Sequence, residues 1–125
     1  MKSRLITSNI DSLISFSEKN IFLGDWCFVG KNFQEYQNFN FKKIKYHLNE
    51  PNKLKKDYKY LNHLYPKILI SLANFLNDFH KTNYSKRYWE IVIGPTLVQL
   101  LSVFWDRWEL INKAVKTEKI DYVPI

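Results

Sequence analysis

The stretch LKKDYKYLNHLYPKILISLANFLNDF, residues Leu54 to Phe79, decides the fold because its apolar residues recur with the period of an α-helix. They are spaced alternately by four and three residues, so all of them fall on one helix face. This predicted face consists of Leu54, Tyr58, Leu61, Tyr65, Ile68, Leu72, Phe75 and Phe79. Pro66 lies inside the pattern and predicts a kink, because proline removes one backbone hydrogen bond. Before the pattern, Asn49 is a candidate N-cap and Pro51 suits a first helical turn.

A second apolar seam with the same spacing follows in the C-terminal third of the chain. Its members are Leu97, Leu101, Phe104, Trp108, Ile111 and Val115. The polar connector 81–84 separates the two patterns, and Ser85 is a candidate N-cap for a short helical segment through Ile93. Gly94 and Pro95 predict a break or a bend before the second seam. Two long helices, packed on a sheet or on each other, account for both seams.

Short runs rich in Ile, Leu, Phe and Tyr predict strands at Arg4 to Thr7, Ile21 to Leu23 and Lys43 to His47. The segment Ile120 to Ile125 has the character of a further strand. Strands followed by long helices indicate an α/β domain, and a final strand without a closing helix would leave a parallel sheet incomplete. We therefore expect residues 1–125 to form a single α/β domain, the N-terminal fragment of a longer protein.

Composition excludes several classes of protein. An apolar fraction of 46% with 17% aromatic residues supplies a real core. The single cysteine excludes an internal disulfide framework, and no Cys/His cluster has zinc-ligand spacing, so we expect no metal. The N-terminus does not resemble a signal peptide, which favours the cytoplasm. The apolar run Ile91 to Trp105 is shorter than the ~20 residues that span a bilayer. It predicts a buried helix, with an interfacial helix as the alternative and no transmembrane helix.

The formal net charge of +7 is concentrated in one region. Seven lysines fall between positions 42 and 59, where Glu50 and Asp57 are the acidic residues. Such a patch favours an anionic partner, which could be nucleotide phosphate, an anionic membrane surface or nucleic acid. A solvated lysine-rich face is the commoner explanation of the same pattern.

Two candidate chemical groups follow predicted strands, at the edge where ligands bind in open α/β sheets. Asp25, after Gly24, could be a general base or accept a hydrogen bond from a substrate hydroxyl, with Trp26 beside it as a substrate contact. His47 could act as an acid, a base or a donor to phosphate. The alternatives are an ordinary turn aspartate and a structural histidine. No glycine-rich phosphate-binding motif occurs in the chain.

Arg87, Tyr88 and Trp89 form the third candidate group. A guanidinium held against aromatic rings suits bidentate binding of phosphate or carboxylate in a substrate. The alternative is an arginine that stacks on Trp89 or pairs with Glu90.

Four segments stand in a characteristic order: FLGDWC (22–27), KYHLNEPNKLKKDYKYLNHLY (45–65), FHKTNYSKRYWEIVIGPTL (79–97) and FWDRW (104–108). Together they resemble the start of a family of transferases encoded in O-antigen and other surface-polysaccharide biosynthesis clusters. The resemblance covers almost the whole chain. The chain departs from the family pattern at Asp25, where glutamate is usual, and at Thr96, where tryptophan is common.

The resemblance implies a longer transferase with a two-domain, glycosyltransferase-like architecture. This chain would be a partial Rossmann-like (glycosyltransferase-B-like) N-terminal domain, with short parallel strands and two or three long helices. Such a domain contacts the acceptor, here an anionic sugar or lipid, while a nucleotide sugar donor binds beyond Ile125; we expect no cofactor in this segment. The protein would work in the cytoplasm or peripherally at the inner face of the cell membrane. Asp25 and His47 would then be catalytic, and Arg87, Tyr88, Trp89 and Trp26 would bind substrate.

A non-enzymatic basic module that binds nucleic acid or an acidic partner is the alternative function. It would use the same lysines, with Tyr58 and Tyr60 as stacking partners. Tyr58 falls on the helix face predicted to be core, and we therefore regard nucleic acid as the less favoured partner.

Overall fold

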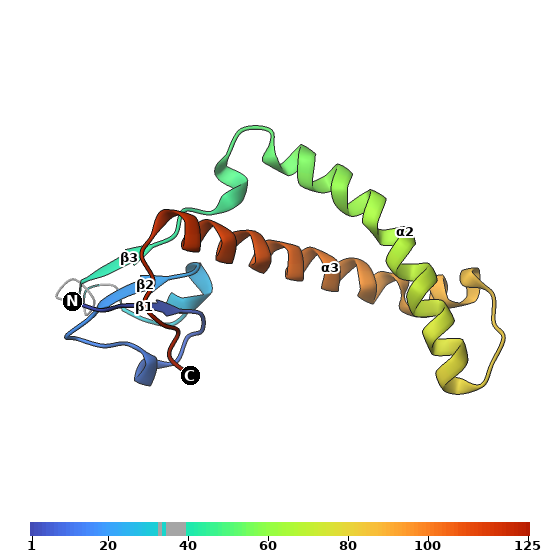
Figure 1. Cartoon of the computed structure of the whole chain (residues 1–125), viewed down its shortest axis with the longest axis horizontal. Helices are drawn as coiled ribbons and strands as arrows, with labels where there is room; N and C mark the ends of the chain where they lie inside the picture. Colours follow the sequence, from blue (N-terminus) through green and yellow to red (C-terminus); the bar gives the residue numbers. More distant parts are fainter. Residues whose placement is uncertain (33, 35–39) are drawn as a thin grey trace. The chain divides into compact units, whose positions relative to one another are not determined.

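The structure, a computed structural model, describes residues 1–32, 34 and 40–125. Three short strands, β1 (Ser3–Ile6), β2 (Lys19–Phe22) and β3 (Phe41–Lys43), precede two long helices, α2 (Lys53–His80) and α3 (Lys86–Thr117) (Figure 1). Three 3-10 turns lie between them: η1 (Asp11–Leu13), η2 (Asp25–Phe28) and η3 (His47–Asn49). The prediction of a mixed α/β fold with short parallel strands is confirmed.

The chain divides into two compact units. Residues Met1–Asn49 and Trp108–Ile125 form one, which we call the sheet unit. Residues Glu50–Arg107 form the other, which we call the helical unit. The last turns of α3 belong to the sheet unit and the rest of that helix to the helical unit.

The sheet has the order β1-β2-β3, and both pairings are parallel. Ile6 is in register with Phe22, and Phe22 with Lys43, so the three strands end together at one edge. The predicted third strand, Lys43 to His47, is wrong because β3 lies earlier and ends at Lys43. The last bond to β2 runs from the amide of Ile44 to the carbonyl of Phe22 at 2.9 Å, and pairing stops there because β2 ends and its chain turns into η2.

Both faces of the sheet are covered. Successive side chains of β1 and β2 point to opposite faces, and apolar side chains on each face are buried. Leu5 and Ile21 belong to one buried cluster, while Ile6 and Phe22 belong to another. The first cluster also contains Leu23, Ile44, Leu110 and Ala114, and the second Cys27 and Phe28. The end of α3 therefore packs on one face, and η2 on the other.

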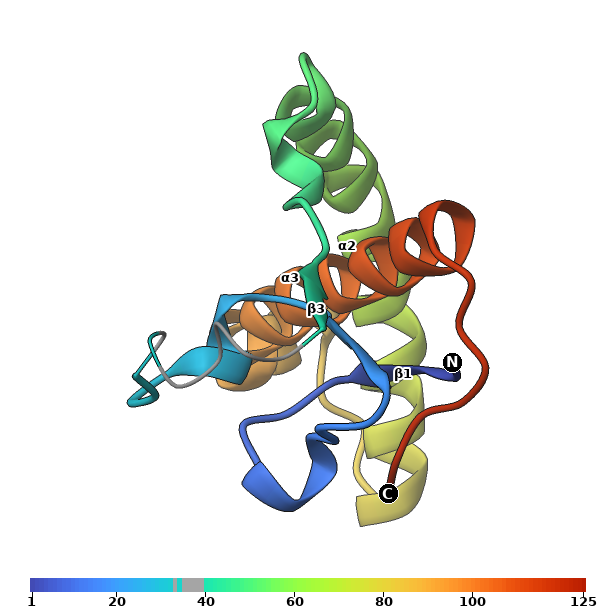
Figure 2. The same ribbon diagram turned by 90° about the vertical axis from the view of Figure 1, so that its left-hand side faces the viewer.

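The C-terminal segment lies beside β1 (Figure 2). Tyr122 forms a parallel bridge with Arg4. The carbonyl of Tyr122 accepts a hydrogen bond from the amide of Leu5 at 3.0 Å. The amide of Asp121 donates to the carbonyl of Ser3 at 2.9 Å. The predicted strand at 120–125 thus pairs in parallel with the sheet, though as one bridge rather than a full strand.

α2 begins at Lys53 and runs through Pro66 to His80 without interruption. Asn52, in the left-handed conformation with φ of 61°, takes the N-cap position, so the prediction of Asn49 as N-cap is wrong. The predicted apolar face is half-buried only in its middle, at Leu61, Tyr65, Ile68 and Leu72. Its ends, Leu54, Tyr58, Phe75 and Phe79, are exposed. Within the helical unit, α3 is the long helix beside α2. The predicted face is only partly covered because one helix can cover only a narrow strip of another.

α3 continues through Gly94 and Pro95, so the predicted break is absent. Pro95 removes only its own bond to the preceding turn, and the bonds on either side keep the helix intact. Gly94 has a different role: a Cβ atom at this position would lie 2.9 Å from the hydroxyl oxygen of Tyr65. The glycine therefore allows α2 and α3 to approach closely inside the helical unit.

The second predicted seam is wrong beyond Leu101. In the helical unit the inward line of α3 repeats every four residues, through Trp89, Ile93, Leu97, Leu101 and Trp105, all of them buried or half-buried. Phe104 and Trp108 are 65% and 58% exposed. Because Ile91 to Trp105 is apolar on every side, the sequence pattern could not identify which side faces inward.

Candidate functional site

Asp25 and Lys43 meet at the carboxyl edge of the sheet. Asp25 opens η2 after β2, and Lys43 is the last residue of β3. Their side chains form an ion pair with the Lys43 amine 2.5 Å from a carboxylate oxygen of Asp25. The Asp25 side chain is 83% exposed, so a solvent-accessible carboxylate stands beside a cation where the sequence predicted chemistry.

Trp26 lies at the same edge and is held by the fold. Its indole nitrogen donates to the carbonyl of Thr7, just after β1, at 2.8 Å. Its ring lies over Gly24, where an added Cβ would be 2.0 Å from a ring carbon. The half-buried ring also packs against both buried clusters. These contacts fix the chain that leads from β2 to Asp25.

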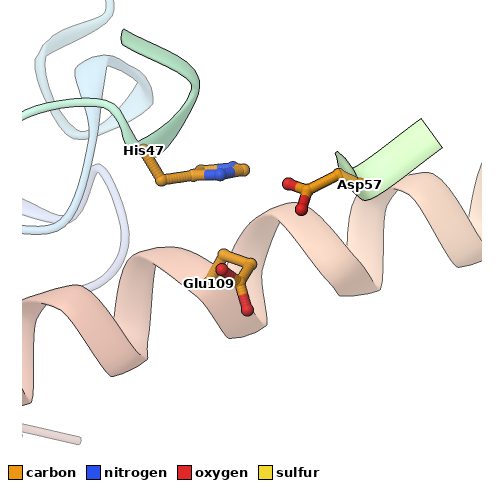
Figure 3. Close-up of side chains that lie close together, drawn as sticks. All are labelled: His47, Asp57 and Glu109. Atoms are coloured by element: carbon orange, nitrogen blue, oxygen red, sulfur yellow. The ribbon is translucent and has the colours of Figure 1, made fainter. Parts of the chain in front are cut away.

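His47 is buried, at 2% exposure, and lies on η3 against the ring of Tyr46. A carboxylate oxygen of Glu109, on the part of α3 in the sheet unit, lies within 4.8 Å of an imidazole nitrogen (Figure 3). Sequence reasoning missed Glu109 because nothing near it in the chain signals the contact. A carboxylate beside an imidazole can orient the ring.

His47 and Glu109 are also residue types that bind metal ions. The pair is also suited to proton transfer or to positioning of the imidazole ring.

In the helical unit, Asn77 organises the connection between α2 and α3. Its side-chain oxygen accepts hydrogen bonds from the Trp89 indole at 2.9 Å, the Thr82 hydroxyl at 3.0 Å and the Tyr84 amide at 3.0 Å. Its side-chain nitrogen donates to the Tyr84 carbonyl at 2.9 Å. Trp89 is only 7% exposed, so its ring is committed to the interior of the unit. No sequence pattern predicted this role for Asn77.

Arg87 and Tyr88 are exposed next to that buried tryptophan. Arg87 pairs with Glu90, one turn away, at 3.0 Å, which is one of the alternatives that the sequence left open. The ring of Tyr88 stacks on Tyr84 with 4.1 Å between ring centroids. Exposed stacked tyrosines beside an arginine offer an apolar platform and a cation, which suit a sugar or a nucleotide.

The six predicted site residues thus form two groups. Asp25, Trp26 and His47 lie in the sheet unit, and Arg87, Tyr88 and Trp89 lie in the helical unit. Asp25 and Trp26 share the carboxyl edge, whereas Trp89 holds the helix connection together. Their assignment to catalysis and substrate binding stays a prediction.

The predicted basic patch is divided by ion pairs. Lys42 pairs with Glu118, Lys43 with Asp25, and Lys53 with Asp57. Lys55, Lys56 and Lys59 follow on α2 and are exposed. Lys45, between β3 and η3, is exposed as well. The exposed lysines of the patch thus lie both after β3 and on the first turns of α2.

Comparison with known proteins identifies the class. A family model of transferases matches residues 3–125, which is almost the entire chain. The chain belongs to this family, described as the LIC12162 family transferase. No match was found among curated proteins or among solved structures.

Proposed function

We propose that this chain is the acceptor-binding part of a sugar transferase that works in cell-surface polysaccharide assembly, with a Rossmann-like fold of the glycosyltransferase-B-like type. Membership of a transferase family supports the reaction class, and the resemblance of the four sequence segments to O-antigen cluster proteins supports the sugar substrate. The observation that carries the proposal is the exposed Asp25 carboxylate, held beside Lys43 at the carboxyl edge of a parallel sheet.

Asp25 would act as the general base. Its carboxylate takes the proton of an acceptor hydroxyl as the hydroxyl oxygen forms a bond to the anomeric carbon of the donor sugar. The bond from that carbon to the nucleotide phosphate breaks, and the nucleotide leaves with the bonding electrons. Lys43 would hold the carboxylate in place through the ion pair and attract an anionic acceptor. The nucleotide sugar would bind to another domain of the transferase.

His47 would support this edge. Its burial at 2% exposure favours a positioning role, with Glu109 holding the imidazole and so the chain that follows β3. Arg87, Tyr84 and Tyr88 would supply a second contact surface for sugar or phosphate. The location would be the cytoplasm, at the inner face of the membrane.

Replacement of the proposed base tests this function. In the complete transferase, Asp25→Asn keeps the size of the side chain and should lower kcat by about 10²–10⁴. Asp11→Asn is the matched control, because Asp11 is also an exposed aspartate paired with a lysine in the sheet unit. Sugar transfer should be measured with a panel of nucleotide sugars. Unchanged kcat in Asp25→Asn would exclude Asp25 as the base, and no transfer from any nucleotide sugar would overturn the reaction class.

One observation favours the alternative function, a basic binding module. Tyr58 and Tyr60 were predicted to be stacking partners, and they are 66% and 47% exposed on α2, beside the exposed lysines of its first turns. The expectation that Tyr58 is core is thus wrong. Binding to a random single-stranded oligonucleotide, measured across a salt titration, separates the two functions, since a true module would retain affinity at physiological salt.

A further inference from the structure

The middle of α3 lacks charge altogether. From Ile91 to Trp105 the sequence IVIGPTLVQLLSVFW contains no acidic or basic residue. Inside the helical unit one side of this stretch packs inward through Gly94 and Leu97, which are buried. A soluble helix normally carries charged or polar residues on its opposite side. Here the opposite side is also apolar.

We call this opposite side the α3 outer face. Its residues recur every three or four positions: Tyr88, Ile91, Val92, Pro95, Val98, Gln99, Ser102 and Val103. Ile91 is 64% exposed, and Val98 and Val103 are 51% and 52% exposed. The hydroxyl of Ser102 donates to the carbonyl of Val98 at 2.9 Å, so its polarity is satisfied inside the helix. Gln99 is then the main polar group on the face.

Both ends of the uncharged stretch carry aromatic and basic residues. Tyr88, which is 42% exposed, stands just before its start, and tyrosine is a residue that favours membrane interfaces. Trp89 and Trp105 face the interior of the helical unit and are not part of this surface. Lys86 and Arg87 are exposed before it, and Arg107 follows it. Arg87 pairs with Glu90 and Arg107 with Asp106, so Lys86 adds the net positive charge at these ends. This arrangement suits the boundary between lipid chains and anionic headgroups.

The extent of the apolar surface agrees with a lipid environment. Among the residues that the structure describes, α3 is the one helix long and apolar enough to cross a membrane, judged by length and composition alone. A core helix of a soluble protein passes the same test but is mostly buried, whereas only 17% of the 18-residue apolar window of α3 is buried. The prediction of a buried helix is therefore wrong for this side of α3.

We propose that the α3 outer face docks on the surface of an anionic lipid bilayer, with the helix lying in the interface. The uncharged run of about 15 residues rises ~22 Å, short of the ~30 Å hydrocarbon core, which favours lying in the interface over spanning. The excess of positive charge in the chain, +7, complements anionic headgroups. This function is independent of the transfer reaction, because its readout is membrane binding alone.

Vesicle co-sedimentation tests the proposal. The chain should bind phosphatidylcholine vesicles that contain phosphatidylglycerol, and bind pure phosphatidylcholine vesicles more weakly. The double variant Val98→Asp/Val103→Asp should reduce the partition coefficient on the order of tenfold or more, since it places two charges in the docking face. The matched control is Asn62→Asp/Ser71→Asp, which adds the same charge at exposed positions of α2 and should change binding about twofold or less. Circular dichroism should show the same helix content in all three proteins.

Three results would overturn the proposal. The first is no binding of the unmodified chain to anionic vesicles. The second is an equal loss of binding in the two double variants, which would assign the effect to net charge alone. The third is a dimer in gel filtration that Val98→Asp/Val103→Asp dissociates while vesicle binding is unchanged, which would make a second copy the occupant of the face.

Discussion

The side-chain oxygen of Asn77 accepts a hydrogen bond from the indole nitrogen of Trp89 at 2.9 Å, and this contact joins the end of α2 to the start of α3. The same oxygen also fixes Thr82 and Tyr84, so one amide satisfies most of the polar groups in the connection. The segment HKTNYSKRYW thus owes its local structure to a residue that precedes it.

Asn77→Ala should destabilise the helical unit by about 2–3 kcal/mol, because several hydrogen bonds lose their partner at once. Asn74→Ala, at an exposed position one turn earlier on the same helix, should cost little. Trp89→Phe keeps most of the packing and removes one hydrogen bond, so about 1 kcal/mol is expected. Urea denaturation monitored by circular dichroism measures all three. Equal stability of the two asparagine variants would contradict the role of Asn77.

Gly24→Ala should be strongly destabilising, since the new methyl group would meet the Trp26 ring at 2.0 Å. Overpacking of this kind costs about 1–3 kcal/mol. Gly30→Ala is the informative comparison, because Gly30 has φ of +75° and open space around it, so its substitution tests backbone strain alone. That strain should cost about 1 kcal/mol. Thermal unfolding should therefore rank Gly24→Ala below Gly30→Ala, and the reverse order would contradict the proposed contact.

Gly94→Ala should displace the Tyr65 side chain, because its methyl group would lie 2.9 Å from the hydroxyl oxygen of Tyr65. Removing that oxygen with Tyr65→Phe should relieve the clash. A double-mutant cycle measures the coupling, and we expect the double variant to be more stable than Gly94→Ala alone. Additive effects of the two substitutions would show that the helices do not approach at this point.

The stability of the sheet unit should fall in acid. Hydrogen bonds from Tyr122 and Arg4 lower the pKa of Glu18, and those from Lys42 and Lys19 lower the pKa of Glu118. A carboxyl group with a lowered pKa in the folded state contributes stability that is present above its unfolded pKa, about 4.3, and is lost as the pH falls through the lowered value. Glu18→Gln and Glu118→Gln should each flatten this acid limb in denaturation curves recorded from neutral pH downward.

The stability of the sheet unit should also fall in alkali, where the pKa shift has the opposite direction. The carboxylate of Glu18 raises the pKa of Tyr122, since it accepts a hydrogen bond from the phenol. A raised pKa favours the protonated form in the folded state, so this contribution is present below about pH 10 and is lost as the pH rises through the raised value. Tyr122→Phe should remove the effect. If its stability fell as steeply as that of the parent chain above pH 10, another group would be responsible.

The sequence was sufficient to predict the first two strands and the two long helices, but not the place of the third strand or the side of each helix that is covered. β1 and β2 were recognisable by the short apolar runs Leu5-Ile6 and Ile21-Phe22, whose alternate side chains are buried in the two clusters. In α3 the uncharged run Ile91 to Trp105 is compatible with more than one line of apolar residues along the helix. The predicted line through Phe104 and Trp108 was wrong, because both side chains are exposed.

For the predicted site, too, local features could be predicted from the sequence, whereas contacts between distant segments could not. Asp25 could be placed at the sheet edge from the strand that precedes it, and the pairing of Arg87 with Glu90 could be foreseen because the two lie one helical turn apart. Lys43 as partner of Asp25, and Glu109 as neighbour of His47, depend on contacts between segments distant in the chain. No local pattern encodes such contacts.

The segment that holds Asp121 and Tyr122 against β1 also has a protective consequence. The amide of Leu5 and the carbonyl of Ser3 are already bonded, so this part of the outer edge of β1 offers no free template to another polypeptide. Displacement of residues 118–125 would uncover that edge and withdraw the carboxylate that Lys19 and Lys42 share. The uncovered edge would then be open to strand-to-strand association.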